Sequence, residues 1–326
     1  MGWLKRPPFF LFSQTTGVNM SGQEKHNIEF DYNSCRFDGN TDVPTILRTI
    51  TSPMSVILQI TRKCQFSCIF CSEPEQIPDP SLEALNIMKQ NLKGVKRIFL
   101  SGGEPLCRND FDEVLNIFSG EYIIGLPTNA IASSRLLAHI KEKVSFVNIG
   151  LDGPRKITTR IRGNYDAIMK GIEQFKAYDV PISLTSVVLR STMDSLLYTC
   201  QIADMLNAKK VKFILPIPKG NALKLPADEY LTHNECIPLF EEIKSGKQKF
   251  GWSPLMTFTT WTRDTEGYSV LVYPNGNTFA WPVFSKPEKV LSLGNILNDP
   301  IELIWQRYPY KVNHIRKYIG KSIFVV

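Results

Sequence analysis

Hydrophobic and polar positions follow two alternating periods along the middle of the chain. Short apolar runs rich in β-branched residues predict strands, and apolar residues three or four positions apart predict amphipathic helices. The predicted strands are 55–60, 95–100, 122–126, 146–151, 181–189 and 211–216. The predicted helices among them are 81–93, 111–118, 133–143, 164–178 and 193–207.

Strands that alternate with helices indicate βαβ units and a parallel sheet. We therefore expect an α/β fold built as a partial (β/α)6 TIM-like barrel. In parallel sheets of this kind, functional residues gather at the carboxyl ends of the strands.

The alternation stops after about residue 225. A helix at 229–245, a hairpin of 268–273 and 278–281 with an Asn-Gly turn, and a closing helix at 300–308 predict a small α+β extension. Residues 1–50 show no clear period. We divide the chain into an N-terminal arm (1–50), a barrel (51–225) and a C-terminal region (226–326).

Composition narrows the class of protein. Of 326 residues, 43% are apolar and 21% are charged, which is ordinary for a globular chain, and the net charge is +7. Lysines and arginines are dispersed, so we expect no nucleic-acid partner; a solvated basic surface is favoured, with an anionic substrate as the alternative. No apolar run reaches the ~18–20 residues that span a bilayer. Pro7 and Pro8 interrupt the N-terminal apolar stretch, which favours an N-terminal arm over a signal peptide. We expect no membrane partner, and the cysteine pattern described next indicates a cytoplasmic protein.

The cysteines indicate a metal site. Three of the seven fall within eight residues, at Cys64, Cys68 and Cys71, and the others (Cys35, Cys107, Cys200 and Cys236) are far apart. Such spacing favours metal binding in a reducing compartment over a disulfide framework. A loop after a strand can wrap three thiolates around an iron–sulfur cube and leave one iron open. Zinc is the alternative, but structural zinc takes four ligands, and no fourth Cys or His lies close in sequence.

The CxxxCxFC arrangement of 64–71, placed after the first predicted strand, resembles the signature of the radical S-adenosylmethionine (SAM) superfamily. Further stretches at successive strand ends also resemble that family: the GGEP of 102–105, Thr128-Asn129, Leu151-Asp152-Gly153 and Leu215-Pro216. The resemblance runs from about residue 54 to 225. It implies one [4Fe–4S] cluster on Cys64, Cys68 and Cys71 with SAM on the open iron.

The resemblance also implies which residues bind SAM. The implied contacts are Phe70, Gly102, Gly103, Glu104, Thr128, Asn129, Asp152, Arg190 and Leu215. Phe70 would lie beside the adenine, GGEP would meet the methionine end, and Arg190 would reach the carboxylate by bidentate pairing. Two positions depart from the family pattern: Ala130 stands where glycine is usual, and Gly150 replaces a serine that commonly helps hold the ribose.

The C-terminal region resembles the SPASM/twitch extension, on the YPNG of 273–276 and the LGN of 293–295. In that extension a cysteine normally follows the hairpin and begins an auxiliary cluster. Trp281 and Pro282 occupy that place here, and no cysteine follows Cys236. The resemblance therefore implies a scaffold without auxiliary clusters. Cys200 and Cys236 are expected to be buried small hydrophobes, and Cys107 is assigned no role.

In the family, a reduced cluster cleaves SAM to methionine and a 5′-deoxyadenosyl radical, which abstracts hydrogen from a substrate carbon. We expect an enzyme of a biosynthetic or maturation pathway that acts on a small molecule, or on a peptide supplied by a partner. Its electrons are expected from an external flavodoxin or ferredoxin. The alternatives are a peptide-modifying maturase and a non-enzymatic iron–sulfur scaffold or regulator.

Overall fold

The six predicted strands form the centre of one sheet. The computed structural model describes residues 30–32, 36–37, 50–260, 269–284, 290–308 and 323–326. The central strands are β3 (Ser55–Thr61), β4 (Arg97–Gly102), β5 (Ile123–Thr128), β6 (Phe146–Gly150), β7 (Ile182–Val187) and β8 (Lys210–Ile214). The helices that connect them are α2 (Leu82–Asn91), α3 (Phe111–Phe118), α4 (Ser134–Lys143), α5 (Arg155–Ile161), α6 (Tyr165–Ala177) and α7 (Leu196–Met205).

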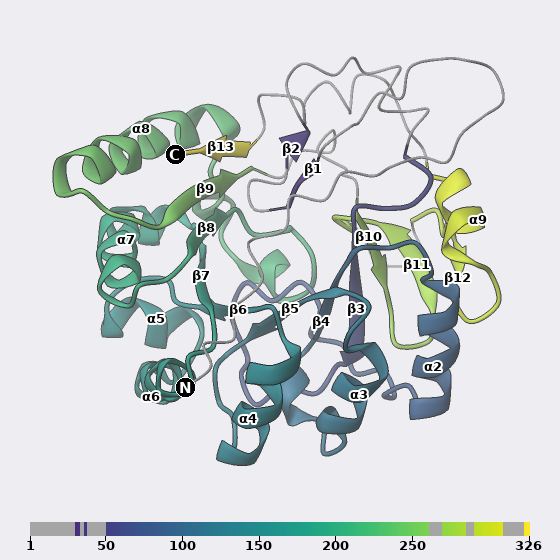
Figure 1. Ribbon diagram of the computed structural model, residues 1–326. Helices are drawn as coiled ribbons and strands as arrows, with labels where there is room; N and C mark the ends of the chain where they lie inside the picture. The colour runs from purple at the N-terminus through teal and green to yellow at the C-terminus, as the bar shows by residue number, and fades with distance from the viewer. Residues whose placement is uncertain (1–29, 33–35, 38–49, 261–268, 285–289, 309–322) are drawn as a thin grey trace, which may run out of the picture.

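These six strands are parallel and lie beside one another in chain order. β9 (Leu255–Thr259) continues the sheet beside β8, and β10 (Ser269–Val272) adds a parallel strand beside β3. The sheet is open, because different strands form its two edges. Helices α2 to α7 lie along the outer side of the strands (Figure 1). The predicted α/β fold, a partial TIM-like barrel, is confirmed.

The core lies between the strands and these helices. The apolar stripe of α3 is an example: Phe111, Val114, Leu115 and Phe118 recur at helical spacing and are fully buried. Burial of each such side chain contributes about 1.5–3 kcal/mol before entropy is counted. The packed layer fixes the strands, so their carboxyl ends can hold loops in defined positions.

Side-chain caps explain where several helices begin. Ser81 accepts a hydrogen bond from Ala84 N at the start of α2, and Asn164 accepts one from Ala167 N at the start of α6. Helix α8 (His233–Phe250) begins with a capping box formed by Thr232 and Glu235. The caps at Ser81 and Asn164 account for the close agreement between the predicted and observed starts of α2 and α6, whereas α8, predicted from residue 229, begins four residues later at His233.

The C-terminal region extends the same sheet. The predicted hairpin is confirmed as β10 and β11 (Asn277–Ala280), with Gly276 at φ +82° in the turn. Strand β12 (Gly294–Asn295) and helix α9 (Ile301–Gln306) follow, and β13 (Ile323–Val325) pairs with β9. The division at residue 225 stays a prediction.

The predicted N-terminal arm lies mostly outside the described residues, as does Cys35. Within its described part, β1 (Phe30–Asp31) pairs with β2 (Arg36–Phe37). Arg97, at the amino end of β4, donates a hydrogen bond to Tyr32 O at 2.5 Å. This hairpin is therefore attached at the opposite end of the strands from the GGEP loop.

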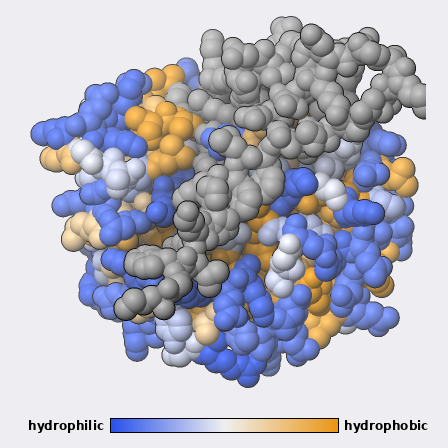
Figure 2. All heavy atoms as spheres, in the orientation of Figure 1, coloured by the Kyte–Doolittle hydropathy of each residue, from blue (hydrophilic) through white to orange (hydrophobic). Residues whose placement is uncertain are grey.

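Where Figure 2 colours the surface by hydropathy, polar side chains predominate and hydrophobic ones gather in smaller patches. Among the residues that the structure describes, no helix combines the length and the apolar character needed to cross a membrane.

Candidate functional site

Each motif of the barrel that was singled out in the sequence lies at or just after the carboxyl end of a central strand. The cysteine loop follows β3, GGEP overlaps the end of β4, and Thr128 is the last residue of β5. Because neighbouring parallel strands end at one edge of the sheet, these loops meet. Backbone bonds join two of them directly: Gly103 N donates to Thr61 O at 2.8 Å, and Glu104 N donates to Lys63 O at 2.7 Å.

The loop that carries Cys64, Cys68 and Cys71 is fixed from two sides. Ile69 N donates to Ile161 O at the end of α5 (3.0 Å). On the other side Asn221, which follows β8, donates from its backbone to Cys71 O (2.8 Å) and from its side chain to Cys68 O (3.2 Å). The loop is therefore held by backbone contacts that leave its thiols available.

All three thiols are free of disulfide bonds. Burial raises the pKa of Cys64 to about 11, and it also raises the pKa values of Cys68 and Cys71. Thiols in this state are protonated at neutral pH and lose their protons when they bind a cation, so metal loading should release protons.

In the described part of the chain, no three Cys, His, Asp or Glu side chains are arranged to hold a single metal ion. A cubane cluster does not require such convergence, because each of three thiolates binds a different iron atom. Spacing and loop position therefore fit a cluster of several irons better than a closed mononuclear site.

Gly102 and Gly103 let the β4 loop pack against the backbone that precedes Cys64. A Cβ on Gly102 would lie 2.9 Å from the Thr61 carbonyl carbon, and one on Gly103 would lie 2.7 Å from Arg62 O. Gly102 also has φ +137°, which L side chains rarely adopt. Both positions therefore require glycine for a physical reason: the two loops touch through their main chains.

Glu104 is a buried carboxylate that no Lys, Arg or His of the described residues pairs with. Its side chain accepts hydrogen bonds from Leu106 N (3.1 Å), Thr128 Oγ1 (2.8 Å) and Asn129 N (2.6 Å). Burial raises its pKa to about 7, and these donors only partly offset that effect. A buried carboxylate lacking a cation fits the ammonium group of an amino acid such as the methionine part of SAM.

Asn129 supplies an unused donor beside this carboxylate. Its Oδ1 accepts from Gln65 Nε2 at 3.1 Å, whereas its Nδ2 is buried and has no partner. Gln65 is the residue after Cys64, so the orphan donor lies next to the cysteine loop. Such a donor fits a ligand oxygen, as the predicted SAM site requires.

Arg162 is a site residue that the sequence reasoning missed. Its guanidinium makes a two-pronged ion pair with the fully buried Asp152, and it lies 4.8 Å from the centre of the Phe70 ring. Its carbonyl accepts from Cys68 Sγ at 3.8 Å. The signal available in the sequence was Gly150, because the absent side chain there leaves the space that the guanidinium fills.

Two further positions predicted to contact SAM, Leu215 and Arg190, lie in different surroundings. Leu215 is buried and its N donates to Thr259 O at 3.2 Å. Arg190 donates to Asp228 O at 2.7 Å and pairs with Glu235 at 2.6 Å, so its side chain is engaged by the segment around α8. The SAM contacts of both residues stay predictions.

The cysteines outside the triplet fall into two groups. Cys200 and Cys236 are fully buried, as expected for small hydrophobes. Cys107 lies near the loop, where its thiol donates to Gln65 Oε1 at 2.8 Å. It therefore borders the site although it received no role from the sequence.

Comparison with known proteins agrees with this geometry. Residues 58–201 match the family model described as "Radical SAM superfamily". A probable GTP 3′,8-cyclase of Methanococcus maripaludis is 32% identical over 213 residues, which cover 59% of this chain and 67% of that protein. A PqqA peptide cyclase of Bradyrhizobium diazoefficiens is 29% identical over 60% of this chain and 56% of its own length.

Solved structures share the fold at low sequence identity. SuiB of Streptococcus suis, bound to its precursor peptide SuiA, has a TM-score of 0.70 at 12% identity and covers 81% of this chain and 67% of its own. The protein anSMEcpe, with bound AdoMet and a peptide, has a TM-score of 0.64 at 17% identity, covering 82% of this chain and 84% of its own. This chain belongs to the radical SAM superfamily, whose members use a [4Fe–4S] cluster and SAM.

Proposed function

We propose that this chain is an enzyme that cleaves SAM reductively at a single [4Fe–4S] cluster on Cys64, Cys68 and Cys71, and that the 5′-deoxyadenosyl radical abstracts hydrogen from a substrate carbon. The observation that carries the proposal is the position of the unpaired Glu104 carboxylate, one loop away from three free thiols. When bound, the cluster would supply an open iron that holds the cofactor and an electron that reduces it.

The chain's own residues orient the cofactor. Glu104 would accept the ammonium group of SAM, and the free Nδ2 of Asn129 would donate to an oxygen of the same ligand. Phe70 would lie beside the adenine, with the Arg162–Asp152 pair fixing its ring from behind. Glu104, Thr128 and Asp152 are buried, so water is excluded from this part of the site.

The substrate is proposed to be a small molecule or a peptide delivered by a separate protein. The relatives support both classes, since one is named as a GTP cyclase and another as a peptide cyclase. Because the cysteines of the SPASM-type auxiliary site are missing from this sequence, we favour reactions that need no second internal electron acceptor. The electron donor is proposed to be a flavodoxin or a ferredoxin.

Anaerobic reconstitution tests the proposal. The chain, loaded with iron and sulfide and then reduced with dithionite, should convert SAM to 5′-deoxyadenosine and methionine, which mass spectrometry detects. Cys68→Ala should abolish both products, and Cys200→Ala serves as the matched control because Cys200 is buried in α7. A brown protein that forms no 5′-deoxyadenosine would be an iron–sulfur scaffold instead.

A further inference from the structure

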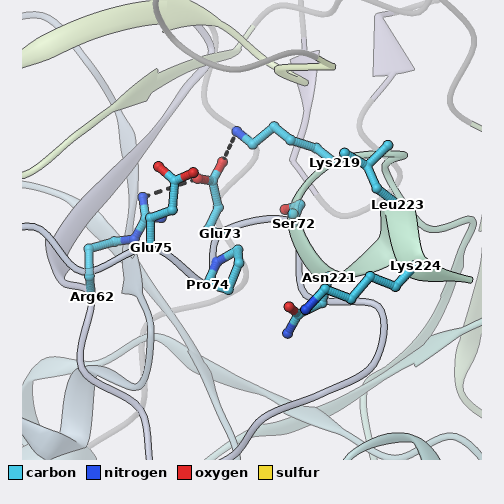
Figure 3. A pocket seen from close by; sticks show the side chains of 10 residues that line it. Arg62, Ser72, Glu73, Pro74, Glu75, Lys219, Asn221, Leu223 and Lys224 are labelled. Carbon is cyan, nitrogen blue, oxygen red and sulfur yellow. Dashed lines mark hydrogen bonds and ion pairs between the residues drawn. The ribbon is translucent and has the colours of Figure 1, made fainter.

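A small cavity lies between the segment that follows Cys71 and the loop that follows β8. It has a volume of about 210 Å³, and Figure 3 shows the side chains that surround it. Its lining includes Arg62, Glu73, Glu75, Lys219, Asn221 and Lys224. No residue predicted to bind SAM is among those that line it. Pockets for whole ligands measure roughly 300–1,000 Å³, so this cavity suits one group of a larger molecule.

The cavity lies between the loops that follow β3 and β8, the first and the last of the six central strands. Arg62 follows β3 and Lys219 follows the loop after β8, and both pair with Glu73 from opposite sides (Figure 3). Tyr273, at the end of β10, joins the same group: its hydroxyl lies 2.9 Å from Lys219 Nζ and donates to Glu73 Oε1 at 3.0 Å. The carboxylate of Glu73 is thereby fully engaged.

The charge around the cavity is positive. Arg62, Lys219 and Lys224 contribute three cations against the two carboxylates of Glu73 and Glu75, which leaves one positive charge in excess. Arg62 and Lys219 are 3% and 5% exposed, so water screens their charges poorly. Lys224 is exposed on the rim and forms no ion pair within the described ranges.

Arg62, which lines the cavity, has one buried donor without a partner. Arg62 Nη1 bonds Gln59 Oε1 at 2.9 Å and Glu73 at 3.0 Å, but its Nε is buried without an acceptor. An unpaired buried donor on a charged group is costly, and native proteins usually satisfy one with a water, an ion or a ligand. With the excess positive charge, an oxyanion satisfies this donor better than a neutral group does.

The cavity adjoins the cysteine loop. Ser72 and Glu73 follow Cys71 directly, and a Cβ on Gly220 would lie 2.7 Å from Cys71 O. We propose that this cavity binds a carboxylate or phosphate group of the substrate, with Arg62 Nε as the buried donor and Lys219 and Lys224 supplying charge. The inference rests on the proposed function, because it gives the substrate an anionic group that anchors it beside the cluster.

Calorimetry on the full-length chain tests the site without the reaction. The probes are inorganic phosphate, inorganic pyrophosphate, acetate and glycylglycine, each titrated at low and at high NaCl. We expect saturable binding of at least one of them that weakens with salt. Binding of the phosphate probes alone assigns a phosphoryl group, and binding of the two carboxylates alone assigns a carboxylate.

Three variants locate the binding. Arg62→Lys keeps a cation for Glu73 but removes the Nε donor, and should weaken binding roughly tenfold. Lys224→Gln changes only an exposed rim residue and should weaken it about threefold, which keeps the test valid if Arg62→Lys does not fold. Lys244→Gln, on the exposed face of α8, is the matched control and should leave binding within about twofold.

Absence of saturable binding by every probe, or equal weakening in Lys244→Gln, overturns the inference. The proposed function is judged separately by 5′-deoxyadenosine formation in the wild-type chain. A chain that cleaves SAM but binds no oxyanion contradicts only the cavity assignment, and a chain that binds phosphate but never cleaves SAM contradicts only the proposed function.

Discussion

The guanidinium of Arg162 occupies the space that a side chain at position 150 would need. A Cβ built on Gly150 would overlap Nη1 and Cζ of Arg162 and would lie 3.0 Å from its Nε. The ion pair between Arg162 and Asp152 therefore depends on the absence of a side chain at Gly150. In this chain an arginine stands at the point of the site where the family commonly places a serine.

Restoring that serine should damage the protein. In Gly150→Ser the guanidinium must move away from Asp152, whose carboxylate is fully buried and keeps only the bond from Val187 N (2.7 Å). Overpacking and a weakened buried ion pair should lower the free energy of unfolding by about 2–4 kcal/mol, which urea titration measures.

A double-mutant cycle separates the two causes. Arg162→Ala alone removes the partner of Asp152 and should also destabilise, by about 3–5 kcal/mol. Gly150→Ser added to Arg162→Ala has no guanidinium to collide with, so it should cost little more. Additive losses in the double variant would show that the two positions are not coupled.

The parts of the fold that sequence predicted are those set by local pattern. The central strands alternate with helices whose apolar stripes and caps, such as Ser81, are formed by residues close in sequence. The presence and the order of these strands and helices could therefore be predicted. Strands β9 and β13 were not predicted. β13 is three residues long and has β9 as its partner across more than sixty positions, a distance that no local period reports.

The site divides in the same way. The triplet and the GGEP loop are contiguous motifs and were found, whereas Arg162 meets Phe70 and Asp152 only through the folded chain. The Glu73–Lys219 pair spans 146 positions and was equally invisible. Arg190 was placed by its motif after the carboxyl end of β7, where the structure has it. Its ion-pair partner there is Glu235 of α8, which the motif did not indicate.

Glu104 should make stability depend on pH. Its folded pKa of about 7 lies above the ordinary 4.5, so the folded state binds the proton more tightly than the unfolded state does. The resulting stabilisation is complete below pH 4.5 and is lost as pH rises through 7, and it amounts to at most about 3 kcal/mol.

Urea unfolding of the cluster-free chain between pH 5 and 8 measures this effect. Glu104→Gln has no group at this position that titrates. As pH rises, the wild type should therefore lose stability relative to the variant, and its unfolding free energy should approach that of the variant or fall below it. A difference that stays constant over this range would contradict a raised pKa. SAM, whose ammonium group pairs with the ionised carboxylate, should bind more tightly at pH 8 than at pH 6.

Arg190→Gln discriminates between two roles of one side chain. A contact with the SAM carboxylate predicts a loss of SAM affinity of tenfold or more, because a charge-assisted pair is removed. The observed contacts with Asp228 and Glu235 favour the other outcome, in which SAM affinity changes less than about threefold. Equilibrium dialysis with labelled SAM on the reconstituted protein distinguishes the two, and Lys244→Gln again serves as the control.

The number of irons tests the inference of a single cluster. Three thiolates of one loop hold one cube, so the reconstituted wild type should contain about four irons per chain. Cys71→Ala should lose most of them, because the loop then offers two ligands. Cys107→Ala should retain them, since its thiol bonds Gln65 and belongs to no ligand triplet. Iron and sulfide analysis that returns about eight per chain would require a second cluster, and with it a reaction in which the substrate radical has an internal electron acceptor.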